Sequence, residues 1–171
     1  MNIFTKRLTL RAFTLSDLKL LYKLHSNPSV MQYIPSGIRT MDETWLDLHE
    51  DIAHQENHGF SKWAVFLTDT GDFIGRAGWA SMDTTGEVEV GFKFLPQYWG
   101  KGFATEVLQA LLAWGKANIQ SPLIAFAYPE NNASIQVLKK SGMIYLRQDE
   151  YEGKTIVVYS AQRTNSSEPS F

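Results

Sequence analysis

Residues 97–106 read Gln-Tyr-Trp-Gly-Lys-Gly-Phe-Ala-Thr-Glu, and their spacing is the most informative for chemistry in the chain. Gly100 and Gly102 permit a tight turn in which successive backbone N–H groups point outward. A helical pattern begins near Ala104, and the N-terminal end of a helix adds partial positive charge to those amides. The segment therefore predicts a phosphate or pyrophosphate site, although two glycines before a helix also suit an ordinary strand-to-helix turn.

Glu87 and Glu89 form a second feature with chemical potential. Side chains at positions i and i+2 of a strand share one face, so the two carboxylates point the same way and Val88 and Val90 point the other. Such a pair could act as a general base that removes a proton from a substrate, or could attract a cationic amine. The alternative is a solvated sheet face, since acidic residues usually lie outside.

The glycine loop and a second segment together resemble a known family. Gln-x-x-Gly-x-Gly at 97–102 matches the Gln/Arg-x-x-Gly-x-Gly/Ala pyrophosphate loop of the GNAT superfamily of acyl-CoA-dependent N-acetyltransferases. Pro-Glu-Asn-Asn-Ala-Ser at 129–134 and Val-Leu-x-Lys-x-Gly at 137–142 look like the branch with ribosomal-protein N-terminal acetyltransferases of the RimJ/RimL type. The resemblance covers residues 7–160 and implies the GNAT fold and acetyl transfer to a primary amine.

The resemblance also implies where acetyl-CoA, the co-substrate, would bind. In the family, the strand before the loop diverges from its neighbour, and its amides hold the pantetheine arm and polarise the thioester carbonyl; here that strand is residues 89–94. The implied cofactor-binding residues are Phe92, Phe94, Gln97, Gly100, Lys101, Gly102, Ala104, Thr105, Asn131 and Ser134. The implied catalytic residues are Glu89, which matches the Glu of the family's Glu-Ile/Val-Gly-Tyr/Phe strand, and Ser134, which would lie near the sulfur.

Several of these assignments have plainer alternatives. Asn131 could cap the following helix, Ser134 could be a first-turn serine without a ligand, and Lys101 could be a solvated loop lysine. The tyrosine general acid that many family members carry four residues after Ser134 is replaced by Leu138. Ser134 is the nearest polar substitute and Tyr145 is a second candidate, so the general acid stays unassigned.

The acceptor is the least determined part of the expected reaction. In the family the first two helices and their connector wall the acceptor pocket, which implies that residues 27–39 decide specificity, with Tyr33, Arg39 and Glu87 as substrate-binding residues. An N-terminal amine is about 10% neutral at pH 7 and a lysine about 0.04%, so an α-amine of a peptide, protein N-terminus or amino acid is favoured. The alternatives are a polyamine or antibiotic acetyltransferase and a non-catalytic acyl-CoA-binding regulatory module.

The expected elements place these residues around one sheet. The patterns predict a strand at 7–13, helices starting at Thr14 and Thr40, strand runs at 63–67, 73–80 and 87–94, a helix from Ala104, a strand at 123–127, a helix at 132–141 and a hairpin at 143–160. The three central runs form an antiparallel meander, and the strand-loop-helix-strand order after them indicates a crossover with parallel pairing. We expect an α/β (α+β) fold with a mixed sheet of about seven strands, about four helices and a β-α-β cofactor-binding core.

Length and composition bound the function. The 171 residues are 44% hydrophobic, which suits one globular domain at 1–160 and a polar, frayed tail at 161–171. Net charge is −2 without a basic block and no membrane-length apolar run is present, so neither nucleic acid nor a membrane is an expected partner. The absence of cysteine suits the reducing cytoplasm. Because the chain also lacks a Gly-x-Ser-x-Gly motif, it has no evident nucleophile to carry an acyl intermediate, which favours direct transfer in a ternary complex. No metal is expected, because Glu50, His54 and His58 do not form a His-Glu-x-x-His pattern. Members of the family often form homodimers, so the resemblance makes a homodimer an expectation as well.

Overall fold

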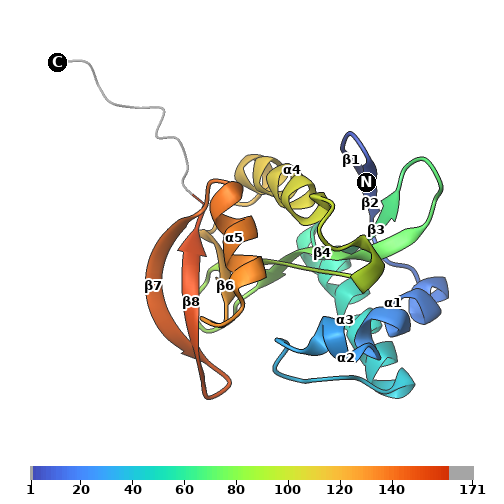
Figure 1. Ribbon diagram of the computed structural model, residues 1–171, viewed down its shortest axis with the longest axis horizontal. Helices are drawn as coiled ribbons and strands as arrows, with labels where there is room; N and C mark the ends of the chain where they lie inside the picture. Colours follow the sequence, from blue (N-terminus) through green and yellow to red (C-terminus); the bar gives the residue numbers. More distant parts are fainter. Residues whose placement is uncertain (1, 162–171) are drawn as a thin grey trace.

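The computed structural model describes residues 2–161, which form one mixed sheet with helices on both faces (Figure 1). The strand order is β1-β2-β3-β4-β5-β6-β8-β7. The strands are β1 (Asn2–Phe4), β2 (Leu8–Arg11), β3 (Lys62–Leu67), β4 (Phe73–Ser81), β5 (Val88–Phe94), β6 (Leu123–Ala127), β7 (Ile144–Tyr151) and β8 (Lys154–Ser160). The predicted tail, apart from Ala161, lies outside the described residues.

The pairing of the strands confirms the predicted meander and crossover. Strands β1 to β5 are antiparallel to their neighbours, and β5 pairs with β6 in parallel. The α4 helix (Phe103–Asn118) makes the connection between these two parallel strands. The hairpin of β7 and β8 completes the sheet, with β8 antiparallel to β6.

The helices divide between the two faces of the sheet. Helices α1 (Leu18–His25), α2 (Pro28–Met31) and α3 (Met41–His58) cover one face, and α4 and α5 (Asn132–Lys140) cover the other (Figure 1). Tight packing holds α4 in place, because Gly115 lies against the fully buried Trp79 of β4 and a Cβ there would be 2.5 Å from the indole ring. We call the side with α1 to α3, on which Glu89 lies, the acceptor face of the sheet, after the expectation that the first two helices and their connector wall an acceptor pocket.

Two helix starts follow the capping signals in the sequence. Thr40 Oγ1 accepts a hydrogen bond from the Glu43 N–H at 3.2 Å, and Glu43 Oε2 accepts one from the Thr40 N–H at 2.8 Å. At the first helix, the Asp17 carboxylate accepts from the Thr14 N–H at 2.8 Å, and a short 3₁₀ turn (Leu15–Asp17) precedes α1. These local bonds fix where the chain enters the acceptor face.

The described residues contain eight strands and five α-helices, against the seven and four expected. The additional strand, β1, has only three residues. The additional helix, α2, lies in the segment predicted as a connector. Asn27 caps it by accepting from the Ser29 and Val30 N–H groups at 2.9 and 3.2 Å, and Pro28 takes its first position. An Asn-Pro pair is a usual stop signal for the preceding helix, but here it also starts the next one.

Candidate active site

An opening between β5 and β6 dominates the candidate site. The two strands pair only at Val88 with Leu123 and at Glu89 with Ile124, whereas β6 stays paired with β8 as far as Ala127. Beyond Glu89, β5 has no strand partner on its β6 side within the described residues. The divergence implied by the family resemblance is therefore confirmed, and the free edge of β5 can pair with an extended ligand through its backbone.

The glycine loop has the geometry of an anion site at the end of this opening. Gly100 and Gly102 have φ values of 72° and 79°, and Gly102 is the N-cap of α4 without a side chain that caps the helix. The first amides of a helix have no acceptors within the helix. In this turn a backbone hydrogen bond runs from the Glu106 N–H to the Gly102 carbonyl. Phe103, Ala104 and Thr105 thus present amides at the positive end of the helix dipole.

Arg7 braces this loop from the segment between β1 and β2, a contact the sequence analysis missed. Its Nη1 donates to the Lys101 carbonyl at 3.0 Å, its Nε donates to Glu106 Oε2 at 2.7 Å, and its guanidinium lies 4.3 Å from the centroid of the Phe103 ring. Glu106 also accepts from Thr5 Oγ1 and from the Arg7 N–H. Burial alone would raise the pKa of Glu106, but these hydrogen bonds outweigh it and lower the pKa.

The other predicted cofactor residues lie on β5 and the loop. Phe94 is buried and its carbonyl accepts from Trp99 Nε1 at 2.7 Å, which ties the loop to the end of the strand. Phe92 is partly buried, while Gln97 is exposed in a short 3₁₀ turn (Pro96–Tyr98). The exposed Lys101 has its Nζ 5.8 Å from the centroid of the Tyr98 ring, so its cationic end lies beside the loop.

Asn131 and Ser134 are bonded to each other at the start of α5. Asn131 Oδ1 accepts from the Ser134 N–H at 3.3 Å, and Asn131 Nδ2 donates to Ser134 Oγ at 3.0 Å. The alternative that Asn131 caps this helix is therefore confirmed, and its contact with a cofactor stays a prediction. Leu138, at the position of the family's tyrosine, is buried in the core. Tyr145 is 54% exposed on the edge strand β7 with its ring against Tyr159, so it does not reach inward.

The structure revises the prediction that Glu87 and Glu89 act together. Glu87 makes two hydrogen bonds of 2.9 Å with Arg147 of β7, on the C-terminal side of the sheet. Glu89 Oε2 instead accepts from Lys62 Nζ of β3 at 2.7 Å. The Glu89 side chain is only 14% exposed, so the alternative of a solvated sheet face is wrong for this residue. With each carboxylate already bound to a cation, the expectation that the pair attracts a cationic amine loses its basis.

Gly91 makes room for the ion pair of Lys62 and Glu89. A Cβ at Gly91 would be 2.7 Å from Lys62 Nζ and 2.8 Å from Glu89 Oε1, and both distances are shorter than real Cβ contacts. Burial lowers the pKa of Lys62, while the charge of Glu89 acts in the opposite direction. Glu89 therefore keeps one oxygen on Lys62 and places the other beside the glycine of the diverging strand.

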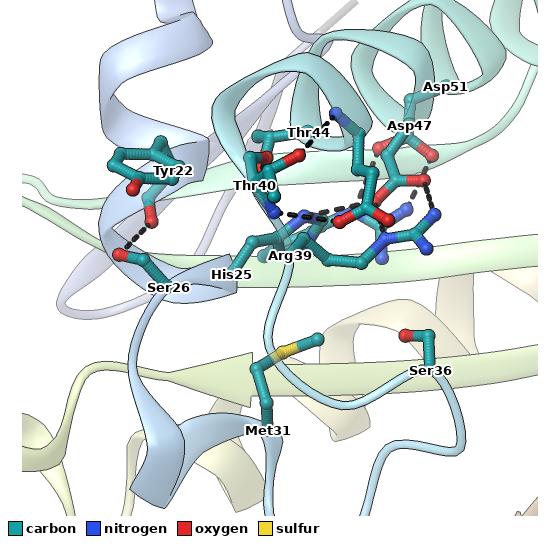
Figure 2. Close-up of polar contacts among 12 residues, drawn as sticks. Tyr22, His25, Ser26, Met31, Ser36, Arg39, Thr40, Thr44, Asp47 and Asp51 are labelled. Carbon is teal, nitrogen blue, oxygen red and sulfur yellow. Dashed lines mark hydrogen bonds and ion pairs between the residues drawn. The ribbon is translucent and has the colours of Figure 1, made fainter.

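The ion pair belongs to a larger buried cluster of charges between the sheet and α3. Arg76 of β4 binds Asp51 of α3 through contacts of 2.6 and 2.8 Å. Arg39 is held by Asp47 of α3 through contacts of 2.5 and 3.0 Å (Figure 2), and its contact with a substrate stays a prediction. Burial would raise the pKa of Asp47, but its close contacts with His25 and Arg39 dominate and hold the pKa well below its usual range.

His25 and Lys93 complete this cluster at the base of α1. The imidazole is 2% exposed, with Nδ1 3.1 Å from Asp47 Oδ2 and off the direction of a well-formed hydrogen bond. Its Nε2 lies 3.1 Å from Lys93 Nζ, and Lys93 also contacts Met31 Sδ at 3.8 Å. Figure 2 shows His25 at the end of α1, Asp47 on α3 and Met31 on α2. Burial lowers the pKa of His25 to about 4 and that of Lys93 to about 7, with the positive charge of Arg76 adding to the effect on Lys93.

Tyr33 links the connector after α2 to the C-terminal half of the sheet. Paired residues of parallel strands share a face, so Ile124 lies on the acceptor face with Glu89. The partly buried Tyr33 packs against an apolar cluster there, formed by Ile124, Tyr128, Ile156 and Val158. A groove of about 180 Å³ opens over this part of the sheet; its lining includes Met82, Phe126, Arg147, Tyr151, Ile156 and Val158.

Two further expectations concern metals and membranes. Within residues 2–161 no group of three or more His, Asp or Glu side chains could hold a metal ion. His54 is engaged by the Phe60 carbonyl at 2.7 Å and by Ser81 Oγ at 3.1 Å, so this member of the Glu50, His54 and His58 series has a structural role. None of the described helices has the length and apolar character needed to cross a membrane.

Comparison with known proteins agrees with this geometry. The family model for the acetyltransferase (GNAT) domain matches residues 7–144. An N-acetyltransferase of Bacillus subtilis strain 168, YnaD, is 34% identical over 145 residues, which cover 84% of this chain and 82% of that protein. A second relative, the Bacillus licheniformis N-acetyltransferase p20, is 30% identical over 166 residues, covering 92% and 93%.

Solved structures share the fold. A GNAT-family acetyltransferase from Bacillus anthracis superimposes with a TM-score of 0.81 at 26% identity, covering 94% of this chain and 98% of that one. RimL, a ribosomal L7/L12 α-N-protein acetyltransferase solved in complex with coenzyme A, gives a TM-score of 0.79 at 19% identity, covering 94% and 97%. At that identity, RimL shows likeness of fold alone.

Proposed function

Because the chain belongs to the GNAT family of acetyltransferases, we propose that this N-acetyltransferase uses acetyl-CoA and passes the acetyl group directly to an α-amine. The observation that carries the proposal is the free edge of β5 leading to the uncapped N-terminus of α4. Such an edge suits a pantetheine arm, and the amides of the loop suit a diphosphate. The CoA-bound RimL structure, with the same fold, supports the choice of cofactor.

The cofactor supplies an activated thioester, and the residues of this chain position it and manage protons. Phe92 and Phe94 lie on the strand whose free edge would hold the arm through backbone bonds. Gly100 and Gly102 turn the loop amides toward the diphosphate, and Lys101 adds positive charge beside them. Arg7 keeps the loop in this conformation through the Lys101 carbonyl, so little reorganisation is required when the cofactor binds.

Glu89 is the group proposed to receive the acceptor's proton. It lies where β5 leaves β6, and only one of its carboxylate oxygens is engaged by Lys62. The other oxygen, beside Gly91, is free to accept a proton directly or through one water molecule. An α-amine with a pKa near 8 needs little help to lose its proton, which suits a single carboxylate.

Ser134 is proposed to assist the departing thiolate. Its hydroxyl accepts from Asn131, which orients it and leaves its own proton for donation. A thiol has a pKa of about 8.5, so protonation of the leaving group helps without being indispensable. Ser134→Ala should therefore reduce kcat much less than Glu89→Gln does.

The α-amine is preferred over the polyamine alternative because of the two carboxylates. Attraction of a polycation would need unpaired negative charge, and Glu87 and Glu89 are each bound by Arg147 or Lys62. A cytoplasmic location and a homodimer stay predictions.

Steady-state kinetics test direct transfer. With acetyl-CoA and an α-amine peptide both varied, double-reciprocal plots should intersect, since both substrates must be bound before the acetyl group moves. Parallel lines, or an acetylated enzyme isolated after incubation with acetyl-CoA alone, would contradict the proposal.

A further inference from the structure

Among residues 2–161, Lys93 has no acidic partner, whereas the other cations of its cluster, Arg39, Lys62 and Arg76, each have one. Three carboxylates of the cluster are each bound to a cation: Asp47 to Arg39, Asp51 to Arg76 and Glu89 to Lys62. These pairs balance in charge. The positive charge of a protonated Lys93 would be left over.

The groups that face Lys93 from the surrounding elements do not supply the missing charge. His25 of α1 is its nearest polar partner, and its low pKa makes the imidazole neutral at pH 7. Met31 of α2 offers only a thioether. The charged groups of α3, β3, β4 and β5 around it are Asp47, Asp51, Lys62, Arg76 and Glu89, and all are engaged as described above. A largely desolvated ammonium without a counter-ion is unfavourable, so the charge of Lys93 is balanced by an anion or removed by loss of the proton.

The position of Lys93 indicates which molecule would bring that anion. Lys93 is two residues beyond Gly91 and four beyond Glu89, so the three share one face of the diverging strand. Its side chain is partly exposed and points to the acceptor face between α1 and α2. The cofactor would put its charged phosphates at the glycine loop, and the pantetheine arm along β5 is uncharged. An anion that pairs with Lys93 would then come from the other substrate.

We propose that Lys93 binds a carboxylate of the acceptor, so that the enzyme prefers amines that carry a carboxylate over amides and polyamines of similar size. This inference rests on the proposed function, since it names the acceptor class of that site. The acceptor is then an amino acid or a peptide with an acid group close to its α-amine. Binding of the carboxylate also draws a proton onto Lys93 Nζ from solvent, because the ion pair favours the charged amine.

A titration that needs no turnover tests the site itself. The ¹³Cε resonance of Lys93, identified by its absence in Lys93→Met, is followed against pH in the CoA complex with propionate or with propionamide. Lys93 should titrate near pH 7 without an anion. Its midpoint should rise by about one pH unit with saturating propionate and stay in place with propionamide. A midpoint near 10, or no difference between the two additives, would overturn the proposal.

Paired acceptors test the consequence for specificity. We would compare L-methionine with L-methioninamide, the peptide Ser-Glu-Ala-amide with Ser-Gln-Ala-amide, and spermidine. In at least one pair, kcat/KM for the acid should exceed that for its amide by roughly 10- to 100-fold, which corresponds to the free energy of one charge-assisted hydrogen bond. The pair that shows this difference tells whether the acceptor is a free amino acid or a peptide. Equal use of acid and amide, or spermidine as the best acceptor, would overturn the proposal.

Three variants separate a binding role from a structural one. Lys93→Met should abolish the preference for the acid, and Lys93→Arg should keep it while removing its pH dependence, because arginine stays charged. Lys116→Met, at an exposed position in the last turn of α4, is the matched control and should change nothing. If no amine is acetylated but propionate still shifts Lys93, the proposed function fails and the carboxylate site stands.

Discussion

Replacing Gly102 with valine tests the glycine loop. The residue has a φ of 79°, a left-handed conformation that costs an L-residue about 1–2 kcal/mol, with β-branched valine at the upper end. A Cβ there would be 3.5 Å from Arg7 Nη2, an ordinary contact, so the protein itself has room for the side chain. The additional methyl groups would instead occupy the space through which a diphosphate approaches the amides. We expect the Kd for CoA to rise at least tenfold, or about 1.4 kcal/mol.

Gly59→Val is the matched control, because Gly59 caps the C-terminus of α3 with a φ of 76° and nothing within 4 Å of its Cβ position. Isothermal titration with CoA and urea unfolding would be measured for both variants. Both should lose about 1–2 kcal/mol of stability, and only Gly102→Val should lose affinity. Equal CoA affinity for the two variants would refute the placement of the diphosphate at this loop.

Three other substitutions probe the brace, the base and the buried lysine. Arg7→Met should raise the Kd for CoA about threefold to tenfold, measured by titration, because the Lys101 carbonyl loses its donor. Glu89→Gln should lower kcat/KM about 100-fold and leave the affinity for CoA unchanged. The control Glu56→Gln, on the exposed side of α3, should have no effect. If Glu89→Gln keeps activity within twofold of wild type from pH 6 to 9, Glu89 has a structural role only. The folded pKa of Lys93, about 7, lies below its unfolded value, so the unfolded chain binds more protons from pH 7 to 10 and stability rises with pH. Urea unfolding should show a gain of about 1–2 kcal/mol from pH 7 to 9 in wild type that Lys93→Met lacks; equal pH dependence would contradict a buried Lys93.

Local signals in the sequence predicted most of the fold. The capping box of Thr40 and Glu43 placed the start of α3, and alternation of side chains placed the central strands, because both depend on residues close in the chain. Local signals failed where an element was very short, as for the three residues of β1, or where one signal had two meanings, as for Asn27-Pro28.

The candidate site was predictable only where backbone conformation defines it. Gly100 and Gly102 revealed the loop, since their spacing reflects a local need for positive φ. The brace between Arg7 and Glu106 joins residues 99 positions apart, and no local pattern reports such a contact. The cations of β3, β4 and β5 occupy strand positions whose burial the sequence pattern does not indicate. Their burial becomes visible only when strand register and the position of α3 are known together.

The most direct test of the central claim is transfer of a labelled acetyl group. Purified protein would be incubated with ¹³C-acetyl-CoA and the acceptor panel, CoA release would be measured with a thiol reagent, and mass spectrometry would locate the label. The account predicts acceptor-dependent CoA release with the label on the α-nitrogen of an amino acid or peptide. Release with spermidine alone, or CoA binding without release for any amine, would contradict it.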